Sequence, residues 1–402
     1  SNPDLQRLTG EILSTIASRP SSPRFIFNPS PYQSNPSLSP TFFEESCEQS
    51  IQRTAKKVKE ALGSNKTYLA ISVLHRLEKE RRDIALEQGS IDANRFGVER
   101  SVMDDLTTPL LPNTAYEEYE KKFLNTLSQL CKTHKTDLLN GRQFEISSKK
   151  MQGISSNFLC KIVDTQKILS CLSEQESLHY DQQAEVDFLL FISNHFFKKK
   201  LEKLEDLETF LNQPDIVFMH AKTQGDITKQ QIPLSQYFFF FHKSELEKDL
   251  PEFAKTELEW NLPFEESQKF LKTPSLLTLV HPNPYYAGSV MSYIDGHQLP
   301  LCFNSTSESA LKENLGLFFY LYAQATPYER GSASIGEMKA KTVCEAKNYK
   351  MEYGEAISFE NERPLPDLDA LTSTSLDEYM PDFLSKCVLT PLLPPSEKNL
   401  PL

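Results

Sequence analysis

The chain has 402 residues and a formal net charge of −12, because 43 lysines and arginines stand against 55 aspartates and glutamates. This balance excludes a broad nucleic-acid-binding surface, which needs a basic footprint. Hydrophobic residues make up 39% of the chain and glycines number only 13, so buried cores are expected but glycine-rich nucleotide folds are disfavoured. No apolar run reaches the roughly 18 residues of a transmembrane helix, so we expect no integral membrane segment.

The seven cysteines are scattered and include no CxxC pair, which argues against a zinc knuckle. We expect reduced thiols in a cytosolic environment and no metal site built on cysteine. No apolar segment follows the first residues, so we expect no classical secretory signal within this sequence.

Residues 1–43 are predicted to form a proline- and serine-rich arm. The stretch 19–41 reads RPSSPRFIFNPSPYQSNPSLSPT, and its prolines cannot propagate a helix. The arm is either an extended linker or a segment whose aromatic residues Phe25, Phe27 and Tyr32 pack on the body or on a partner.

Residues 44–213 are predicted to form a helical bundle. Apolar residues from Ile51 to Leu62 recur at helical spacing, and Gly63 suits the end of that helix. Further helices are expected over 67–87, 115–139, 155–175 and 184–211. The last of these has near-heptad leucines and mixed lysine and glutamate, which favours an extended helical hairpin with a solvated charge run at Lys198–Lys200.

Residues 214–350 are predicted to form a small α+β domain. Short apolar runs predict strands over 216–220, 237–242 and 276–281, and Asp295-Gly296 predicts a β-hairpin with a type I′ turn. A helix is expected over 305–326, with Ser305 and Glu308 as a capping box, and a second helix is expected to end near Tyr349. Residues 351–402 read as an acidic, proline-rich, irregular tail. The predicted fold class is therefore α+β and predominantly helical, with an N-terminal helical bundle followed by a small α+β domain.

Three histidines each close one of these apolar runs: His220, His242 and His281. If the strands were adjacent and parallel, the imidazoles would gather at one sheet edge, which would suit a metal or acid–base site. The alternative is that strand ends meet water and tolerate histidine.

The loop over 326–337 is the strongest candidate site. Pro327 ends a long apolar helix, and small residues from Gly331 to Ser334 lead into the next helix. Backbone N–H groups at a helix N-terminus attract anions, so the amides of 331–334 are expected to form an anion hole. Arg330, with Gly331, would hold a phosphate or carboxylate group.

Three further residues of this loop have candidate catalytic roles. Glu337 would serve as a metal ligand or base, and Ser332 and Ser334 would position the substrate. The alternative is structural: Ser334 and Glu337 form a capping box, Arg330 pairs on the surface, and Gly331 supplies a positive φ.

The segment Pro327-Tyr328-Glu329-Arg330-Gly331-Ser332-Ala333-Ser334 resembles a degenerate Fic/Doc active-site loop, whose pattern is H-P-F-x-[DE]-G-N-G-x-x-R. Pro327 and Tyr328 match the proline and aromatic positions, and Gly331 lies near the first glycine. Thr326 stands where the catalytic histidine should be, Arg330 replaces the acidic residue and Ser332 the asparagine. The resemblance covers about 30 residues and implies a pseudo-enzyme or a different phosphoryl chemistry.

The low glycine content, the irregular helical front and the acidic tail resemble type IV (Dot/Icm-like) secreted effectors of Legionella. This resemblance implies a virulence protein that is secreted by the bacterium into the host cytoplasm. One hypothesis is a transferase of nucleotidyl or phosphoryl type, with ATP and Mg²⁺ as the expected cofactors. The alternative is a non-enzymatic effector whose long helices bind a host protein.

One observation separates these two hypotheses. A pocket where Arg330, Glu337 and a strand-end histidine converge would favour the enzyme. An exposed apolar stripe on a helix would favour the binding protein. The sequence does not set the oligomeric state.

Overall fold

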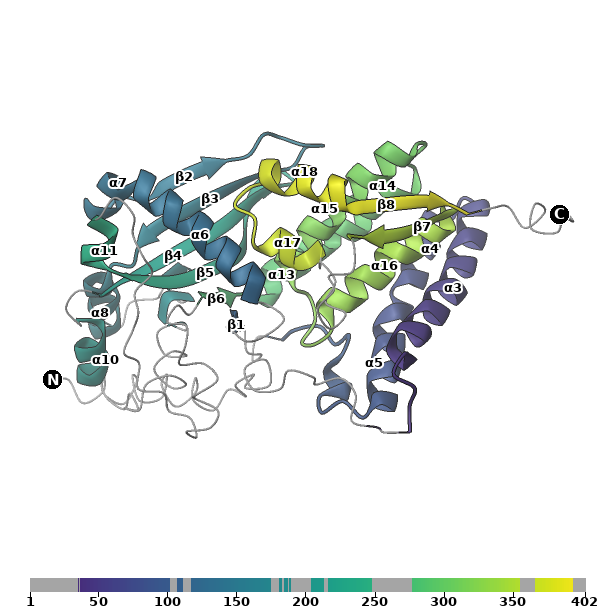
Figure 1. The fold of residues 1–402 in the computed structure, drawn as a ribbon, viewed down its shortest axis with the longest axis horizontal. Coiled ribbons are helices and arrows are strands. Elements are labelled where there is room, and N and C mark those ends of the chain that lie inside the picture. Colours follow the sequence, from purple (N-terminus) through teal and green to yellow (C-terminus); the bar gives the residue numbers. More distant parts are fainter. Residues whose placement is uncertain are drawn as a thin grey trace, which may run out of the picture.

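The computed structural model describes residues 35, 37–101, 107–110, 117–174, 181–182, 184–186, 188, 204–212, 216–247, 277–354 and 366–392. Within these ranges the protein is a predominantly helical α+β fold, as the sequence predicts. Figure 1 shows a sheet at one end, helices α3–α5 at the other, and the remaining C-terminal helices between them.

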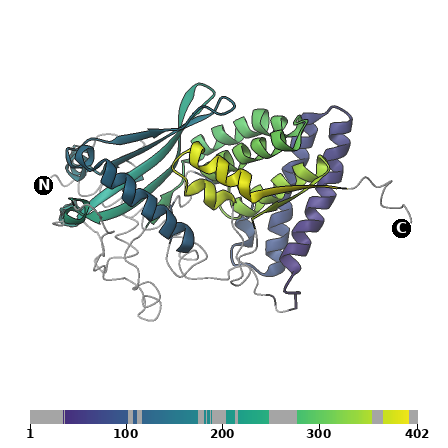
Figure 2. The ribbon, with the colours of Figure 1, turned by 45° about the horizontal axis from the view of Figure 1, so that its top comes forward.

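The main sheet has six strands in the order β1-β6-β5-β4-β3-β2, and all its pairings are antiparallel. The strands are β1 (Thr107–Leu110), β2 (Phe144–Ser147), β3 (Ser155–Ile162), β4 (Ile216–Ile227), β5 (Gln230–His242) and β6 (Leu277–Val280). Helix α6 (Glu117–Thr133) lies across one face, as both views show (Figures 1 and 2). Its Phe123 ring meets Tyr237 of β5 edge-on, with 5.0 Å between the ring centroids.

The helices range from one turn to the 22 residues of α3. Before β4 they are α3 (Phe42–Gly63), α4 (Thr67–Leu74), α5 (Arg76–Gln88), η1 (Ala93–Arg95), α6, α7 (Lys135–Leu139), α8 (Thr165–Ser173) and α10 (Leu204–Leu211). After β5 they are α11 (Lys243–Glu247), α13 (Pro284–Tyr293), η2 (Ile294–Gln298), α14 (Leu299–Phe303), α15 (Glu308–Ala325), α16 (Ser332–Ala346), α17 (Pro366–Leu371) and α18 (Leu376–Lys386).

Helix α15 forms the centre of the molecule, because every residue from Asn314 to Ala325 is buried. A second, two-stranded sheet pairs β7 (Tyr349–Tyr353) with β8 (Cys387–Pro391) beside it. One apolar core contains side chains from Ile51 in α3 to Leu389 in β8. The core and the main sheet therefore both continue across residue 213, where the sequence predicts a domain boundary.

Several predicted helices are confirmed with adjusted limits. The helix expected over 67–87 is two helices, α4 and α5, which meet at His75. Helix α15 begins at Glu308 because the side chain of Ser307 accepts a hydrogen bond from the Ala310 amide. The Ser305 hydroxyl instead donates to the Leu301 carbonyl, so the predicted capping box is wrong.

The helix predicted over 155–175 is wrong in its first half. Residues Ser155–Ile162 form strand β3, which pairs with β4, and only Thr165–Ser173 are helical. The irregular tail predicted from residue 351 is also wrong for 366–392, because α17, α18 and β8 pack against the central helix. Burial against α15 decides the structure of the tail, and its local composition, rich in proline and acidic residues, does not reveal that burial.

The β-hairpin predicted around Asp295-Gly296 is wrong, because residues 284–303 are helical throughout. The side chain of Asn283 caps α13 by accepting from the Tyr286 amide, and Pro284 occupies the first turn, where a missing N–H costs nothing. The Asp-Gly pair lies in the π-helical turn η2, and Gly296 is exposed.

The expected arm 1–34, most of the extended hairpin and the Lys198–Lys200 run lie outside the described residues. Of the helix predicted over 184–211, residues 184–186, 188 and 204–211 are described, and all of them are helical.

Candidate functional site at the 326–337 loop

Two residues with positive φ shape the predicted loop. Thr326 ends α15 with φ 42°, and its hydroxyl donates to the Ala323 carbonyl at 2.8 Å. Gly331 precedes α16 with φ 79°, where a Cβ atom would lie 2.6 Å from Cδ1 of Phe96. Glycine is therefore required at position 331 by both backbone conformation and packing, in line with the structural alternative.

The loop backbone is joined to residues 97–100 by three hydrogen bonds. The Glu329 amide donates to the Val98 carbonyl at 2.8 Å, the Gly97 amide to the Arg330 carbonyl at 3.1 Å, and the Arg100 amide to the Pro327 carbonyl at 3.1 Å. The Glu329 side chain adds an ion pair with Arg95 at 2.9 Å. The loop thus behaves like a short strand docked against the segment that follows η1.

The buried guanidinium of Arg100 closes the C-terminal end of α15. Its Nε donates to the Thr326 carbonyl at 2.5 Å, and its Nη2 donates to the carbonyls of Ala325 at 2.9 Å and Pro282 at 2.7 Å. Carbonyls at a helix C-terminus lack helical partners and carry partial negative charge, so a cation stabilises them. Sequence reasoning missed this residue because its partners lie 182 to 226 positions away in the chain.

The structure does not bring Arg330 and Glu337 together. Arg330 is only 5% exposed, and its guanidinium carbon lies 5.5 Å from the centroid of the Phe96 ring. Glu337 points elsewhere and forms an ion pair with Lys341 one helical turn on, at 2.8 Å. The anion-binding and catalytic roles predicted for these side chains therefore have no common centre.

The two predicted positioning serines hold the turn itself. The Ser332 hydroxyl accepts from the Tyr328 amide at 3.0 Å and donates to the Tyr328 carbonyl at 3.2 Å. The Ser334 hydroxyl accepts from Arg81 Nε at 2.9 Å and donates to the Gly331 carbonyl at 3.1 Å. Both hydroxyls are engaged in local structure, so Ser334 does not form a capping box with Glu337.

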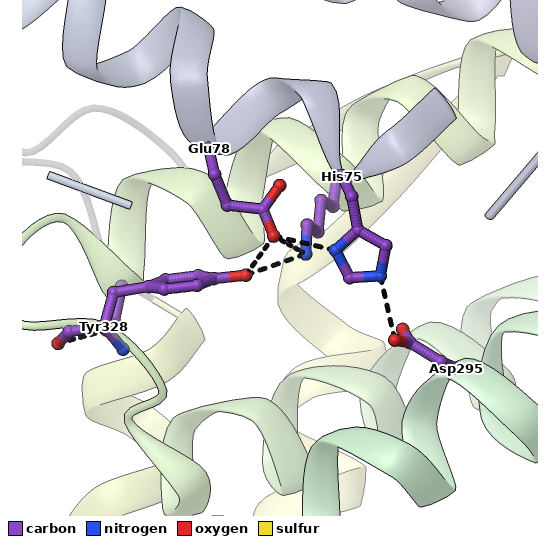
Figure 3. A network of polar contacts seen from close by, with 6 residues as sticks. His75, Glu78, Asp295 and Tyr328 are labelled. Atoms are coloured by element: carbon purple, nitrogen blue, oxygen red, sulfur yellow. Dashed lines mark hydrogen bonds and ion pairs between the residues drawn. The ribbon is translucent and has the colours of Figure 1, made fainter. Parts of the chain in front are cut away.

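A polar network that the sequence did not reveal lies directly beneath the loop (Figure 3). Its centre is Oε1 of Glu78 on α5. This oxygen accepts hydrogen bonds from the Tyr328 hydroxyl, from Lys339 Nζ at 3.2 Å and from His75 Nδ1 at 2.8 Å. Lys339 Nζ also lies 3.1 Å from the Tyr328 hydroxyl oxygen. The network joins the start of α5, the loop and the middle of α16.

The second ring nitrogen of His75 extends the network to the π-helical turn. His75 Nε2 lies 2.8 Å from Oδ2 of Asp295, on the far side of the imidazole from Glu78 (Figure 3). Because each nitrogen faces a carboxylate, the hydrogen bonds that the ring donates to Asp295 and then to Glu78 raise the pKa of His75 to about 9. The ring is therefore an imidazolium that donates from both nitrogens.

The central carboxylate is held ionised. Burial alone would raise the pKa of Glu78, but the His75 hydrogen bond and the Lys339 charge outweigh burial and lower it to about 2. Two carboxylates and two cations then balance within the cluster. The Lys339 side chain is only 2% exposed, so its ion pair with Glu78 is buried.

These features make the cluster a structural ion-pair network more than an acid–base centre. We call the cluster the clasp; its members are His75, Glu78, Asp295, Tyr328 and Lys339. A general base needs a free lone pair and a pKa near the working pH, and the His75 imidazolium has neither. Nothing in the sequence points to this cluster: His75 and Glu78 lie in an ordinary charged helix, and Lys339 is one of several lysines in α16.

The histidines predicted to gather at one sheet edge do not do so, because the strands are antiparallel. His220 is buried within β4, bonded to Glu185 at 2.9 Å and to Gln236 at 2.7 Å. Burial, then the nearby Arg100 charge, lowers the pKa of His281 to about 3. Among the residues that the structure describes, no three metal-binding side chains gather closely enough to hold a metal ion.

No protein-family model matches the chain, and comparison with curated protein sequences gives no significant match. The effector resemblance and the Fic/Doc resemblance therefore stay predictions. No helix in the described ranges is both long and apolar enough to cross a membrane.

Proposed function

We propose that this chain acts by binding another protein through its helical end, where α3 turns into α4. The carrying observation is the exposed apolar surface of α4. Tyr68 is 72% exposed and Leu69 is 40% exposed, although α4 is a short, strongly apolar helix. Tyrosine is enriched at binding surfaces, and Leu69, the next residue of the helix, adds exposed apolar area beside it in the sequence.

The interior role of the 326–337 loop supports this proposal over phosphate transfer. Arg330 packs on an aromatic ring, Glu337 pairs with Lys341, and both loop serines bond to local backbone. An active site needs convergent polar groups that face a substrate. Here the side chains of the predicted site bond to or pack on other groups of the same chain.

We also propose that the protein is a secreted bacterial effector that acts in the host cytosol. Its partner would then be a host protein. This part of the proposal rests on the composition and patterning of the sequence alone. The protein-binding activity itself does not depend on that origin.

Site-specific photo-crosslinking tests the proposal. A benzoyl-phenylalanine placed at Tyr68 should give a discrete adduct with one protein of a eukaryotic lysate. The matched control is Tyr285, which is 77% exposed on α13 and should give no comparable adduct. Equal adduct patterns from both positions, or none from Tyr68, would sink the proposal.

A further inference from the structure

The turn between α3 and α4 carries a positive charge that contrasts with the acidic chain. We call residues 56–69 the α3–α4 tip. They contain Lys56, Lys57, Lys59 and Lys66 but only one carboxylate, Glu60, so their charge is 4 − 1 = +3. The whole chain carries −12. All four lysines are exposed.

These lysines have no carboxylate partners within the described structure. Lys59 Nζ donates to Oδ1 of Asn348 at 2.5 Å, which fixes the tip against the turn between α16 and β7. Lys56, Lys57 and Lys66 form no ion pair with a described residue. Elsewhere, the exposed Lys79 and the half-buried Lys341 do pair with a carboxylate four residues away.

The exposed apolar side chains belong to the same tip. The Lys66 amide donates to the Ala61 carbonyl at 2.9 Å, so the chain reverses tightly and brings the start of α4 against the end of α3. Tyr68 and Leu69 follow two and three residues after Lys66. Exposed apolar side chains and lysines without an ion-pair partner among the described residues thus belong to one helix–turn–helix.

We propose that the α3–α4 tip docks on an acidic face of a protein, with Tyr68 and Leu69 in an apolar seat and Lys57 and Lys66 opposite carboxylates. This inference rests on the proposed function and names the chemistry of the partner. Complementary charge steers the encounter and fixes the register of an interface, while buried aromatic side chains supply most of the affinity.

The tip suits a protein better than an anionic lipid surface. Glu60 lies among the lysines of α3, and Glu352 of β7 lies 3.9 Å from Lys350 near the same end. A protein face can match such a mixture of charges position by position. A uniformly anionic membrane would repel the carboxylates, and two apolar side chains give little insertion.

Charge reversal tests the inference. The double variant Lys57→Glu/Lys66→Glu leaves the Lys59–Asn348 hydrogen bond in place. The matched control is Lys167→Glu on α8, an exposed lysine at the sheet end of the molecule. Circular dichroism and the unfolding midpoint confirm that each variant is folded.

Two measurements report the effect of reversing these lysine charges. The yield of the adduct at Tyr68 should fall at least tenfold in the double variant and as salt is raised, and should stay within twofold of wild type for Lys167→Glu. Fluorescein-labelled poly-L-glutamate, titrated against the full chain, should bind wild type and Lys167→Glu alike and bind the double variant at least tenfold more weakly.

The outcomes separate the inference from the proposed function. An adduct at Tyr68 that is indifferent to charge reversal and to salt overturns the acidic-partner inference and leaves protein binding intact. No adduct at Tyr68 overturns both. Sedimentation of the protein with vesicles containing 30 mol% phosphatidylserine, lost in the double variant, would show that the tip binds a lipid surface and would overturn the protein partner.

Discussion

Replacing Glu78 by glutamine should destabilise the protein by about 3 kcal/mol near pH 6. The pKa of Glu78 falls from 4.5 to about 2 on folding, and each pKa unit corresponds to about 1.4 kcal/mol. The carboxyl side chain is mostly buried, so solvent screening reduces this figure little. Counted from the other partner, the same interaction leaves the Lys339 ammonium buried beside a neutral amide, and breaking a buried ion pair costs a similar amount, about 3–5 kcal/mol.

Urea unfolding of wild type and Glu78→Gln measures this loss. The control is Asp83→Asn, which removes a carboxylate from the same helix in an exposed ion pair with Lys79. Exposed pairs contribute about 0–1 kcal/mol, so this control should stay close to wild type. If Glu78→Gln changes the free energy of unfolding by no more than Asp83→Asn does, the clasp does not stabilise the fold.

The same variant should change how stability depends on pH. The pKa of Glu78 is lowered on folding, so its contribution is present above pH 4.5 and is lost as the pH falls towards 2. The pKa of His75 is raised, so its contribution is complete below pH 6.5 and is lost as the pH rises towards 9. Glu78→Gln should flatten the acid limb. A parallel acid limb in both proteins would contradict the assignment.

Three further substitutions test the surroundings of the loop. Lys339→Met should lower the free energy of unfolding by about 3 kcal/mol, because this ammonium is buried against Glu78. The control Lys341→Met should lower it by under about 1 kcal/mol. Urea unfolding midpoints compare the two variants, and equal losses of stability would count against the clasp. Arg100→Met removes three hydrogen bonds to carbonyls and should lower the free energy of unfolding by about 2–4 kcal/mol. We expect faster proteolysis at residues 326–331. An unchanged cleavage pattern would argue against the capping role of Arg100. Gly331→Ala should lower the free energy of unfolding by about 1–3 kcal/mol, because of backbone strain and a clash. The control Gly63→Ala has open space around it and should be neutral or stabilising by roughly 0.5–1 kcal/mol. Thermal unfolding compares the two, and a reversed order would refute the strain argument.

The helical periodicity of the sequence predicts several helices well, because the spacing of their buried residues is visible within the segment itself. Residues from Ile51 to Leu62 recur on one face, and that face is buried in α3. Strands β4, β5 and β6 were found from their runs of β-forming residues, which the sheet buries on one or both faces. In these segments the local pattern and the tertiary environment agree.

The errors lie where tertiary contacts outweigh local composition. Asp295-Gly296 is a strong hairpin signal, yet the Asn283 cap upstream starts a helix that continues through it. The sequence predicts a helix where β3 lies, because the burial pattern of this strand depends on its pairing with β4. A single sequence does not reveal such distant partners.

The candidate site shows the same limit. Of the segment 326–337, residues 326–331 connect α15 and α16 and 332–337 begin α16, and Gly331 adopts the positive φ of the structural alternative. Residues that contact this segment, such as Glu78, Arg81 and Arg100, lie more than 220 positions away in the chain. A pairing over that distance leaves no local trace, so composition and spacing could suggest a site but not its partners.

Hydrogen exchange of the loop amides, with and without Mg²⁺-ATP, tests the central claim most directly. The account predicts slow exchange for the amide of Glu329, which donates to the Val98 carbonyl, and no change when Mg²⁺-ATP is added. Rapid exchange that slows on adding Mg²⁺-ATP would show an open loop that closes on a phosphate group. That result would contradict the structural role of the loop and restore phosphate transfer as the leading hypothesis.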